Sequence, residues 1–259
     1  MTPRFELAAV ESIEPWGTPS DPSLSWFALS LGDFWIELGR DELFRYTPEV
    51  LAMWTLSSPH PDYQIAAFLR DLHASVGPAL APIPIELARI VGDIERLAEL
   101  DSSTRRAADA IDKDGALMLG ALAWRWLGER SPCMSYLVQY PRFHFVRIGD
   151  EIQIAYDNRD RLINGIPVWT AQLGATRLSI AAFVSAVTDV SAALLDAMAA
   201  RLDDLEHYRV SPRAPVDLAS LREQHTTWTN ELSASFAPTP PEVPWAETLA
   251  ALAALGVKL

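Results

Sequence analysis

The sequence lacks the features that mark several large classes of protein. Cys133 is the only cysteine, which excludes an internal disulfide and a thiolate cluster for a metal. No apolar run reaches the roughly 18 residues of a membrane span. Glu6, Glu11 and Glu14 interrupt the stretch where a signal peptide needs an apolar segment. We therefore expect a cytoplasmic protein.

Motifs for common catalytic and cofactor sites are also missing. The five histidines form no HExxH pair, and the dispersed glycines form neither GxGxxG nor a phosphate-binding loop. There is no GxSxG nucleophile motif, and no histidine or basic residue adjoins Cys133, which we expect to be structural. The segment 157–160 lacks the glycine and the distal glutamate of a calcium loop. We expect no metal and no cofactor.

Positive charge is scarce. The chain has 21 Lys+Arg against 34 Asp+Glu, a formal net charge of −13. This balance disfavours nucleic acid and anionic membranes as partners, because both require basic surfaces. Residues 1–130 hold 20 acids and 11 bases, so most of the excess lies in the first half. An acidic surface attracts basic partners and accelerates association with them.

Apolar residues, in contrast, are plentiful and patterned. They make up 49% of 259 residues, enough for a sizeable core. Two segments, 24–38 and 143–157, place a Gly-Asp pair between runs of strand-forming residues and predict β-hairpins turning at Gly32-Asp33 and Gly149-Asp150. Asn164-Gly165 predicts a further type I′ turn.

Helical periodicity follows each hairpin. Apolar residues at intervals of three and four predict helices over 62–74, 84–100, 104–128, 176–208, 217–232 and 245–255. The segment 237–244 is rich in proline and predicts a stiff connector.

The two hairpin–helix groups predict an internal repeat. The sequence IAAF occurs at 65–68 and at 180–183, and Trp-Thr occurs at 54–55 and 169–170, both at an offset of 115 residues. We predict a helix-rich α+β fold of two pseudo-repeated halves, 1–130 and 131–236, followed by the connector and a short helix over 237–259. Each half is small, so we expect one compact unit.

Several aromatic motifs resemble a family of uncharacterised bacterial proteins, classed as a domain of unknown function. The matching segments are 13–17, 25–27, 43–46, 62–66, 136–137, 145–150 and 169–170. The resemblance covers most of residues 5–208, and its motifs are of a structural kind that names no reaction. Such proteins are also similar in style to the immunity proteins of bacterial toxin systems, which are small, acidic and without enzymatic motifs.

The leading hypothesis is a non-enzymatic binding protein, of the immunity type, that occludes a basic toxin domain. Its acidic residues would pair with Arg and Lys of the partner, and a tryptophan would provide the anchor. The candidate partner-binding residues lie near the first predicted hairpin and are Asp33, Trp35, Glu37, Asp41 and Glu42.

Two alternatives remain open. An enzyme of unknown class would use the acidic and histidine cluster near the second hairpin, which comprises His144, Asp150, Asp157 and Asp160. A structural or oligomerising subunit would instead expose an apolar sheet edge.

Overall fold

The computed structural model describes residues 1–259 except 19, 101, 103–112 and 259. Helices and strands are both abundant, which confirms the predicted α+β class. The strands are β1 (Thr2–Leu7), β2 (Trp16–Thr18), β3 (Asp21–Ser23), β4 (Leu31–Leu38), β5 (Asp41–Leu43), β6 (Asp62–Gln64), β7 (Phe143–Ile148), β8 (Glu151–Asp157), β9 (Leu162–Ile163), β10 (Ile166–Pro167) and β11 (Leu173–Ser179). The helices are α1 (Trp26–Leu29), α2 (Pro48–Trp54), α3 (Ile65–Leu80), α4 (Ile85–Val91), α6 (Lys113–Gly128), α7 (Ile180–Glu206), α8 (Leu218–Leu232) and α9 (Trp245–Ala254), with a further helical stretch over 94–100.

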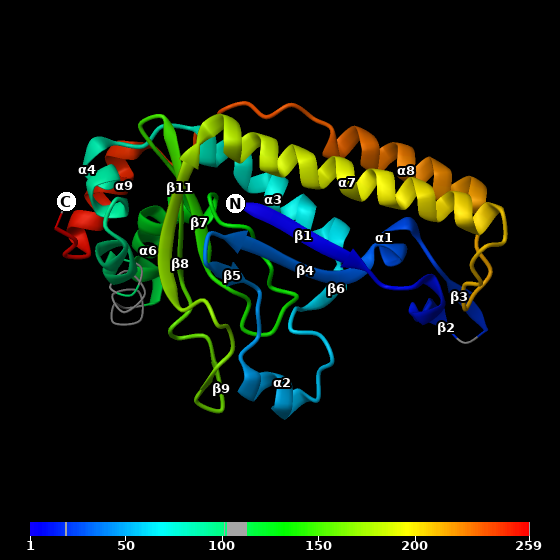
Figure 1. The fold of residues 1–259 in the computed structure, drawn as a ribbon. Helices are drawn as coiled ribbons and strands as arrows, with labels where there is room; N and C mark the ends of the chain where they lie inside the picture. Colours follow the sequence, from blue (N-terminus) through cyan, green and yellow to red (C-terminus); the bar gives the residue numbers. More distant parts are fainter. Residues whose placement is uncertain (19, 101, 103–112, 259) are drawn as a thin grey trace.

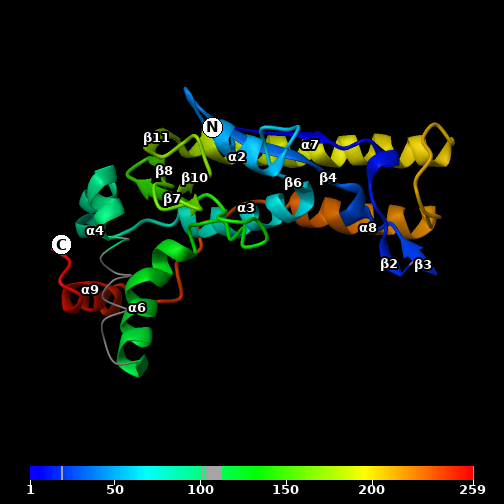
Figure 2. The same ribbon diagram turned by 90° about the horizontal axis from the view of Figure 1, so that it is seen from below.

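Two antiparallel sheets form the centre of the molecule. In the first sheet β4 is central, with β1 on one edge and both β5 and β6 on the other. The second sheet has the order β11-β8-β7. Figure 1 shows the two sheets next to each other, with α7 running along them and α8 packed beside the C-terminal part of α7, and Figure 2 shows the same arrangement from below.

The main core joins both predicted halves of the chain. Alternate residues of β4, Phe34, Ile36 and Leu38, face this core and are almost fully buried. Phe145 and Ile154 enter it from the second sheet, and helices α3 and α7 contribute their apolar stripes. The two sheets are therefore stabilised by the same buried apolar surface.

A second core covers the opposite face of the hairpin β7–β8. Val146 and Ala155 point to this side and pack with Trp126 of α6, with α4 and with Leu252 of α9. Both faces of β8 are consequently buried, whereas the alternation of β1 leaves one of its faces exposed. The first sheet thus presents an outer face, and the second sheet is covered on both sides.

The hairpin predicted over 24–38 is wrong. Ser25 caps the short helix α1 by accepting a hydrogen bond from the backbone N–H of Ala28, and β4 then runs straight through Gly32-Asp33. Gly32 is required by close packing and not by a turn. A Cβ at this position would lie 2.2 Å from the carbonyl oxygen of Glu6 in β1.

The second predicted hairpin is confirmed. Strands β7 and β8 pair in register across Gly149-Asp150, and Gly149 has a φ of 63°. Asn164 and Gly165 also have positive φ, at 53° and 78°, as a type I′ turn between β9 and β10 requires.

The predicted internal repeat is not shown. Both IAAF segments begin a helix directly after a strand, α3 after β6 and α7 after β11. The preceding segments differ, however, because one is helix α1 followed by a single strand and the other is a true hairpin. The matching tetrapeptides reflect two similar strand-to-helix junctions.

The helices agree with the periodicity in type but differ at their ends. Residues 62–64 and 176–179, predicted as first turns of helices, are strand residues in β6 and β11. Helix α4 ends at Val91, and helical structure resumes at 94. The predicted helix 104–128 is observed from Lys113, and its first part lies outside the described residues.

Helix α7 is the one described helix that is long and apolar enough to cross a membrane, judged by length and composition alone. About a third of its most apolar window, 33%, is buried within the protein. The buried side includes Phe183, Val187 and Leu194, which pack into the main core. A core helix of this length passes the same test, so the finding is weak evidence for a membrane span.

Candidate functional site

The outer face of the first sheet gathers four of the five predicted partner-binding residues. Along β4 the side chains alternate, so Asp33, Trp35 and Glu37 lie on the side opposite the core and are all partly exposed. Glu42 stands directly opposite Glu37 on β5 and shares this side. We call this surface the acidic sheet face and define it by Glu6, Asp33, Trp35, Glu37, Glu42 and Asp62. Arg4 of β1, opposite Trp35, also lies on it and pairs with Glu37 at 3.3 Å.

Three carboxylates form a row across the acidic sheet face. Glu6 of β1 and Asp62 of β6 are both in register with Asp33, one on each edge of β4. Directly opposed side chains in antiparallel strands lie about 5 Å apart at Cβ, so the like charges repel one another. Among the ion pairs of the described residues, none involves Glu6, Asp33 or Asp62.

The negative charge of this row shifts the pKa values of neighbouring groups. Burial raises the pKa of Asp62, and the nearby Asp33 carboxylate raises it further. Burial also raises the pKa of Tyr46 to about 12, with additional contributions from Asp33 and then Asp62. Asp33 accepts one hydrogen bond, from the hydroxyl of Ser58.

Trp35 is partly covered by a neighbouring imidazole. The ring of His60 stacks on Trp35 with the ring centroids 4.4 Å apart and the planes 10° from parallel. His60 Nε2 is hydrogen-bonded to Glu42, which also lies 3.5 Å from Arg45. One face of the Trp35 ring is therefore covered by His60, which is itself held by Glu42.

Asp41 does not belong to the acidic sheet face. It is in register with the buried Leu38, and its carboxylate accepts a hydrogen bond of 2.7 Å from the hydroxyl of Tyr156 in the second sheet. This contact raises the pKa of Tyr156 together with burial, which is the larger cause. Asp41 thus connects the two sheets and lies apart from the other four predicted partner-binding residues.

The four residues of the alternative site do not converge. Both carboxylate oxygens of Asp160 lie 2.7 Å from Arg142, and Asp157 pairs with Arg159 at 2.9 Å. Asp150 stands fully exposed in the β7–β8 turn, 3.8 Å from Arg147. In the part of the chain that the structure describes, no carboxylate hydrogen-bonds to His144.

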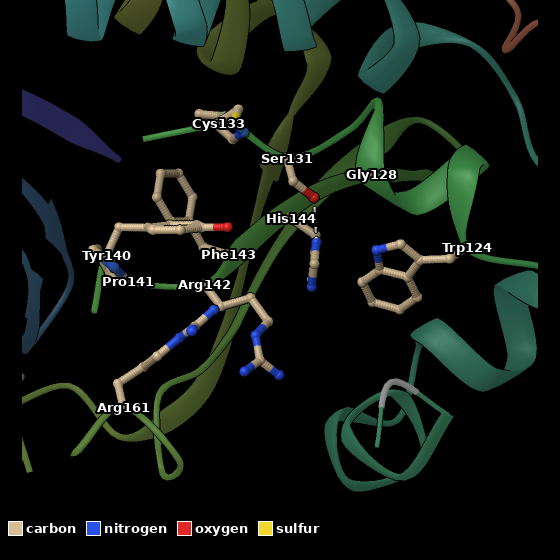
Figure 3. Close-up of a pocket in the computed structure, with 11 residues that line it drawn as sticks. Trp124, Gly128, Ser131, Cys133, Tyr140, Pro141, Arg142, Phe143, His144 and Arg161 are labelled. Carbon is tan, nitrogen blue, oxygen red and sulfur yellow. Dashed lines mark hydrogen bonds between the residues drawn. The ribbon is translucent and has the colours of Figure 1, made fainter. Parts of the chain in front are cut away.

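His144 instead faces a pocket at the end of α6 (Figure 3). Its Nδ1 is hydrogen-bonded to the hydroxyl oxygen of Ser131. Burial, and to a smaller extent the charge of Arg142, lowers the pKa of His144 to about 3, while Asp157 opposes the shift. A general base needs a pKa near the operating pH, so this serine–histidine pair is a poor nucleophile system as it stands. Cys133, expected to be structural, is exposed and lines the same pocket.

The sequence pattern did not indicate three residues at the acidic sheet face. Glu6 and Asp62 join Asp33 only through strand register, and His60 reaches Trp35 from a loop, so no local motif marks any of them. The described residues contain no group of three or more His, Cys, Asp or Glu side chains that could hold a metal ion.

The fold and site define an α+β protein in which the second sheet is buried on both faces and the first sheet has an acidic outer face. Its sequence matches the family of unknown function DUF5984 over residues 3–251, and the chain belongs to that family. Neither the curated proteins nor the solved structures gave a match.

Proposed function

We propose that this chain is a non-enzymatic binding protein whose acidic sheet face receives a basic surface of another protein in the cytoplasm. The observation that carries the proposal is the row Glu6–Asp33–Asp62, three adjacent carboxylates without an ion pair among the described residues. Such a row costs stability by repulsion, and arginine or lysine side chains of a partner would neutralise it.

The surroundings of the row favour a protein partner. Trp35 and His60 supply a flat aromatic surface next to the carboxylates, a combination that suits the anchoring of a guanidinium group. The net charge of −13 adds long-range attraction for a basic molecule. An immunity-type protein, which covers the basic active face of a toxin, is the specific form of this proposal.

The geometry gives less support to an enzyme at 144–160. The imidazole of His144 stays neutral far below physiological pH, and the nearby carboxylates are engaged by Arg142 and Arg159. A pocket with a neutral histidine is better suited to binding than to proton transfer.

The test is affinity capture from the native host with two matched variants. The first reverses three residues of the acidic sheet face, Asp33→Lys, Glu37→Lys and Asp62→Lys. The second reverses three exposed acids of the helices, Glu223→Lys, Glu231→Lys and Glu247→Lys, and changes the net charge equally. We expect a basic protein that the wild type and the helix variant both retain in stoichiometric amount and the face variant loses.

Added salt should also release this protein, because charge pairs at a surface are screened. Retention of the same basic protein by the face variant would contradict the assignment of the surface. Loss from both variants would show that net charge alone, and not the acidic sheet face, determines binding.

A further inference from the structure

The pocket at the end of α6 is a separate feature with its own chemistry. It has a volume of about 260 Å³ and lies between the last turn of α6, the segment 131–133, the start of β7 and the loop that contains Arg161. Sites for drug-sized ligands usually measure about 300–1,000 Å³, so this one suits a molecule with a single ring. Figure 3 shows the side chains that surround it.

The hydrogen bonds of Ser131 determine which ring nitrogen of His144 carries the proton. The hydroxyl of Ser131 donates to the carbonyl oxygen of Leu127 at 2.7 Å, so its oxygen must accept from His144 Nδ1–H. This fixes the tautomer and leaves Nε2 as an acceptor. His144 is only 5% exposed, and Nε2 points into the pocket in Figure 3. Within the described residues, Nε2 has no hydrogen-bond partner.

Two guanidinium groups stand on the other side of the pocket. Arg161 lies over the ring of Tyr140, with its central carbon 5.0 Å from the ring centroid, and is half-buried. Arg142 lies near enough that its charge, after burial, lowers the pKa of Arg161. Arg142 also holds Asp160 through two contacts of 2.7 Å. Asp160 offsets part of the repulsion between the two guanidinium groups, and a ligand anion beside Arg161 would offset it further.

Aromatic walls complete the pocket. Trp124 and Tyr140 line it, and Trp124 meets the ring of His144 edge to face with the centroids 5.8 Å apart. Flat apolar walls of this kind favour a planar ring as ligand.

We propose that this pocket binds a small single-ring aromatic acid. The acid group lies against Arg161 and Arg142, the ring lies between the aromatic side chains, and an O–H or N–H of the ligand donates to His144 Nε2. This site is independent of the acidic sheet face, since the two share no residue.

The experiment measures binding of the ortho, meta and para isomers of hydroxybenzoate by titration calorimetry, with benzoate and phenol as matched probes. We expect at least one isomer to bind with a Kd of about 1 mM or tighter. Benzoate, which lacks the donor, and phenol, which lacks the acid, should each bind at least about tenfold more weakly.

Variants of the protein test the same contacts. His144→Asn retains a donor near the position of Nδ1 but removes Nε2, and Arg161→Met removes the charge while retaining an apolar stem. Each should weaken binding of the hydroxybenzoate by about tenfold or more. Arg159→Gln, in the same loop but outside the pocket, should leave binding unchanged. Circular dichroism confirms that each variant is folded.

Three results would overturn the proposal. They are the absence of saturable binding by all three isomers, equal affinity of the hydroxybenzoate and both simpler probes, and unchanged affinity in Arg161→Met. Because the comparison of probes uses the wild-type protein, the proposal remains testable if His144→Asn does not fold.

Discussion

Strand pairing places Glu6, Asp33 and Asp62 directly beside one another on adjacent strands. Each strand of the first sheet must turn its apolar residues toward the core, so the intervening acids share the outer face and meet across the strands. Natural chains tolerate such repulsion mainly where a surface serves a function. The row of carboxylates that strand register produces is therefore consistent with a binding role for this face.

Neutralising one member of this row should stabilise the protein. We expect Asp62→Asn to raise the free energy of unfolding by up to about 0.5 kcal/mol. The value is modest because the side chain of Asp62, although partly desolvated by its neighbours, keeps contact with solvent that screens its charge. Urea denaturation at low salt measures the change. Glu223→Gln on α8 is the matched control and should have little effect. A destabilised Asp62→Asn protein would contradict the repulsion argument.

Gly32 should be intolerant of any side chain. We expect Gly32→Ala to lower the free energy of unfolding by about 2–3 kcal/mol, because its Cβ would collide with the backbone of β1. Gly149 provides the comparison, since it has open space around it and needs only a positive φ. Asn should be tolerated at 149 but not at 32. Equal effects at the two positions would contradict the distinction.

His144 should make stability depend on pH. Its folded-state pKa of about 3 lies below the usual value of 6.5, so the unfolded chain binds a proton first as the pH falls. Stability is therefore lost below about pH 6.5, by about 2 kcal/mol for this group at pH 5. Denaturation midpoints of wild type and His144→Asn across this range measure the difference. Parallel pH profiles would show that the histidine is not held neutral.

At the scale of elements, capping residues determine where helices begin. Ser179 accepts a hydrogen bond from the backbone N–H of Ala182, which ends β11 and starts α7. Ser25 does the same for α1. Both are ordinary N-cap residues placed before an apolar segment, and each marks a boundary that hydrophobic periodicity alone does not locate.

Loss of the α7 cap should be measurable. We expect Ser179→Ala to lower the free energy of unfolding by about 1 kcal/mol, because the first turn of the helix loses its side-chain acceptor. Ser185→Ala, in the exposed part of the same helix, loses a surface hydrogen bond to Asp189 but gains helix propensity, so it should be close to neutral. Thermal unfolding compares the two. A larger effect at 185 would argue against the capping role.

These elements also show how far the sequence predicts the structure. The hairpin at 143–157 was predictable because its turn residues and its alternating strands agree. The segment 24–38 has the same Gly-Asp signal, yet Gly32 is needed for contact with β1, which is more than 20 residues away in the sequence. Asp33, Trp35, Glu37 and Glu42 could be grouped from the sequence because they lie close together along the chain, while Glu6, His60 and Asp62 join them only through the tertiary fold.

At the scale of the whole molecule, the two sheets differ in how many of their faces are buried. The second sheet lies between two cores, with α4, α6 and α9 on one side and α3 and α7 on the other (Figure 2). The first sheet uses one face for the main core and presents its other face to solvent. The single-ring pocket and the acidic sheet face lie on different parts of this framework, so each can be tested with the other intact.

The central claim is that a basic protein binds on the acidic sheet face. The most direct measurement is hydrogen–deuterium exchange of the chain, alone and in complex with the basic protein that affinity capture isolates. The account predicts slower exchange on binding in β1, β4 and β6, with α8 and α9 unchanged. Slower exchange confined to α7, α8 or α9, with the strands of the first sheet unaffected, would contradict it.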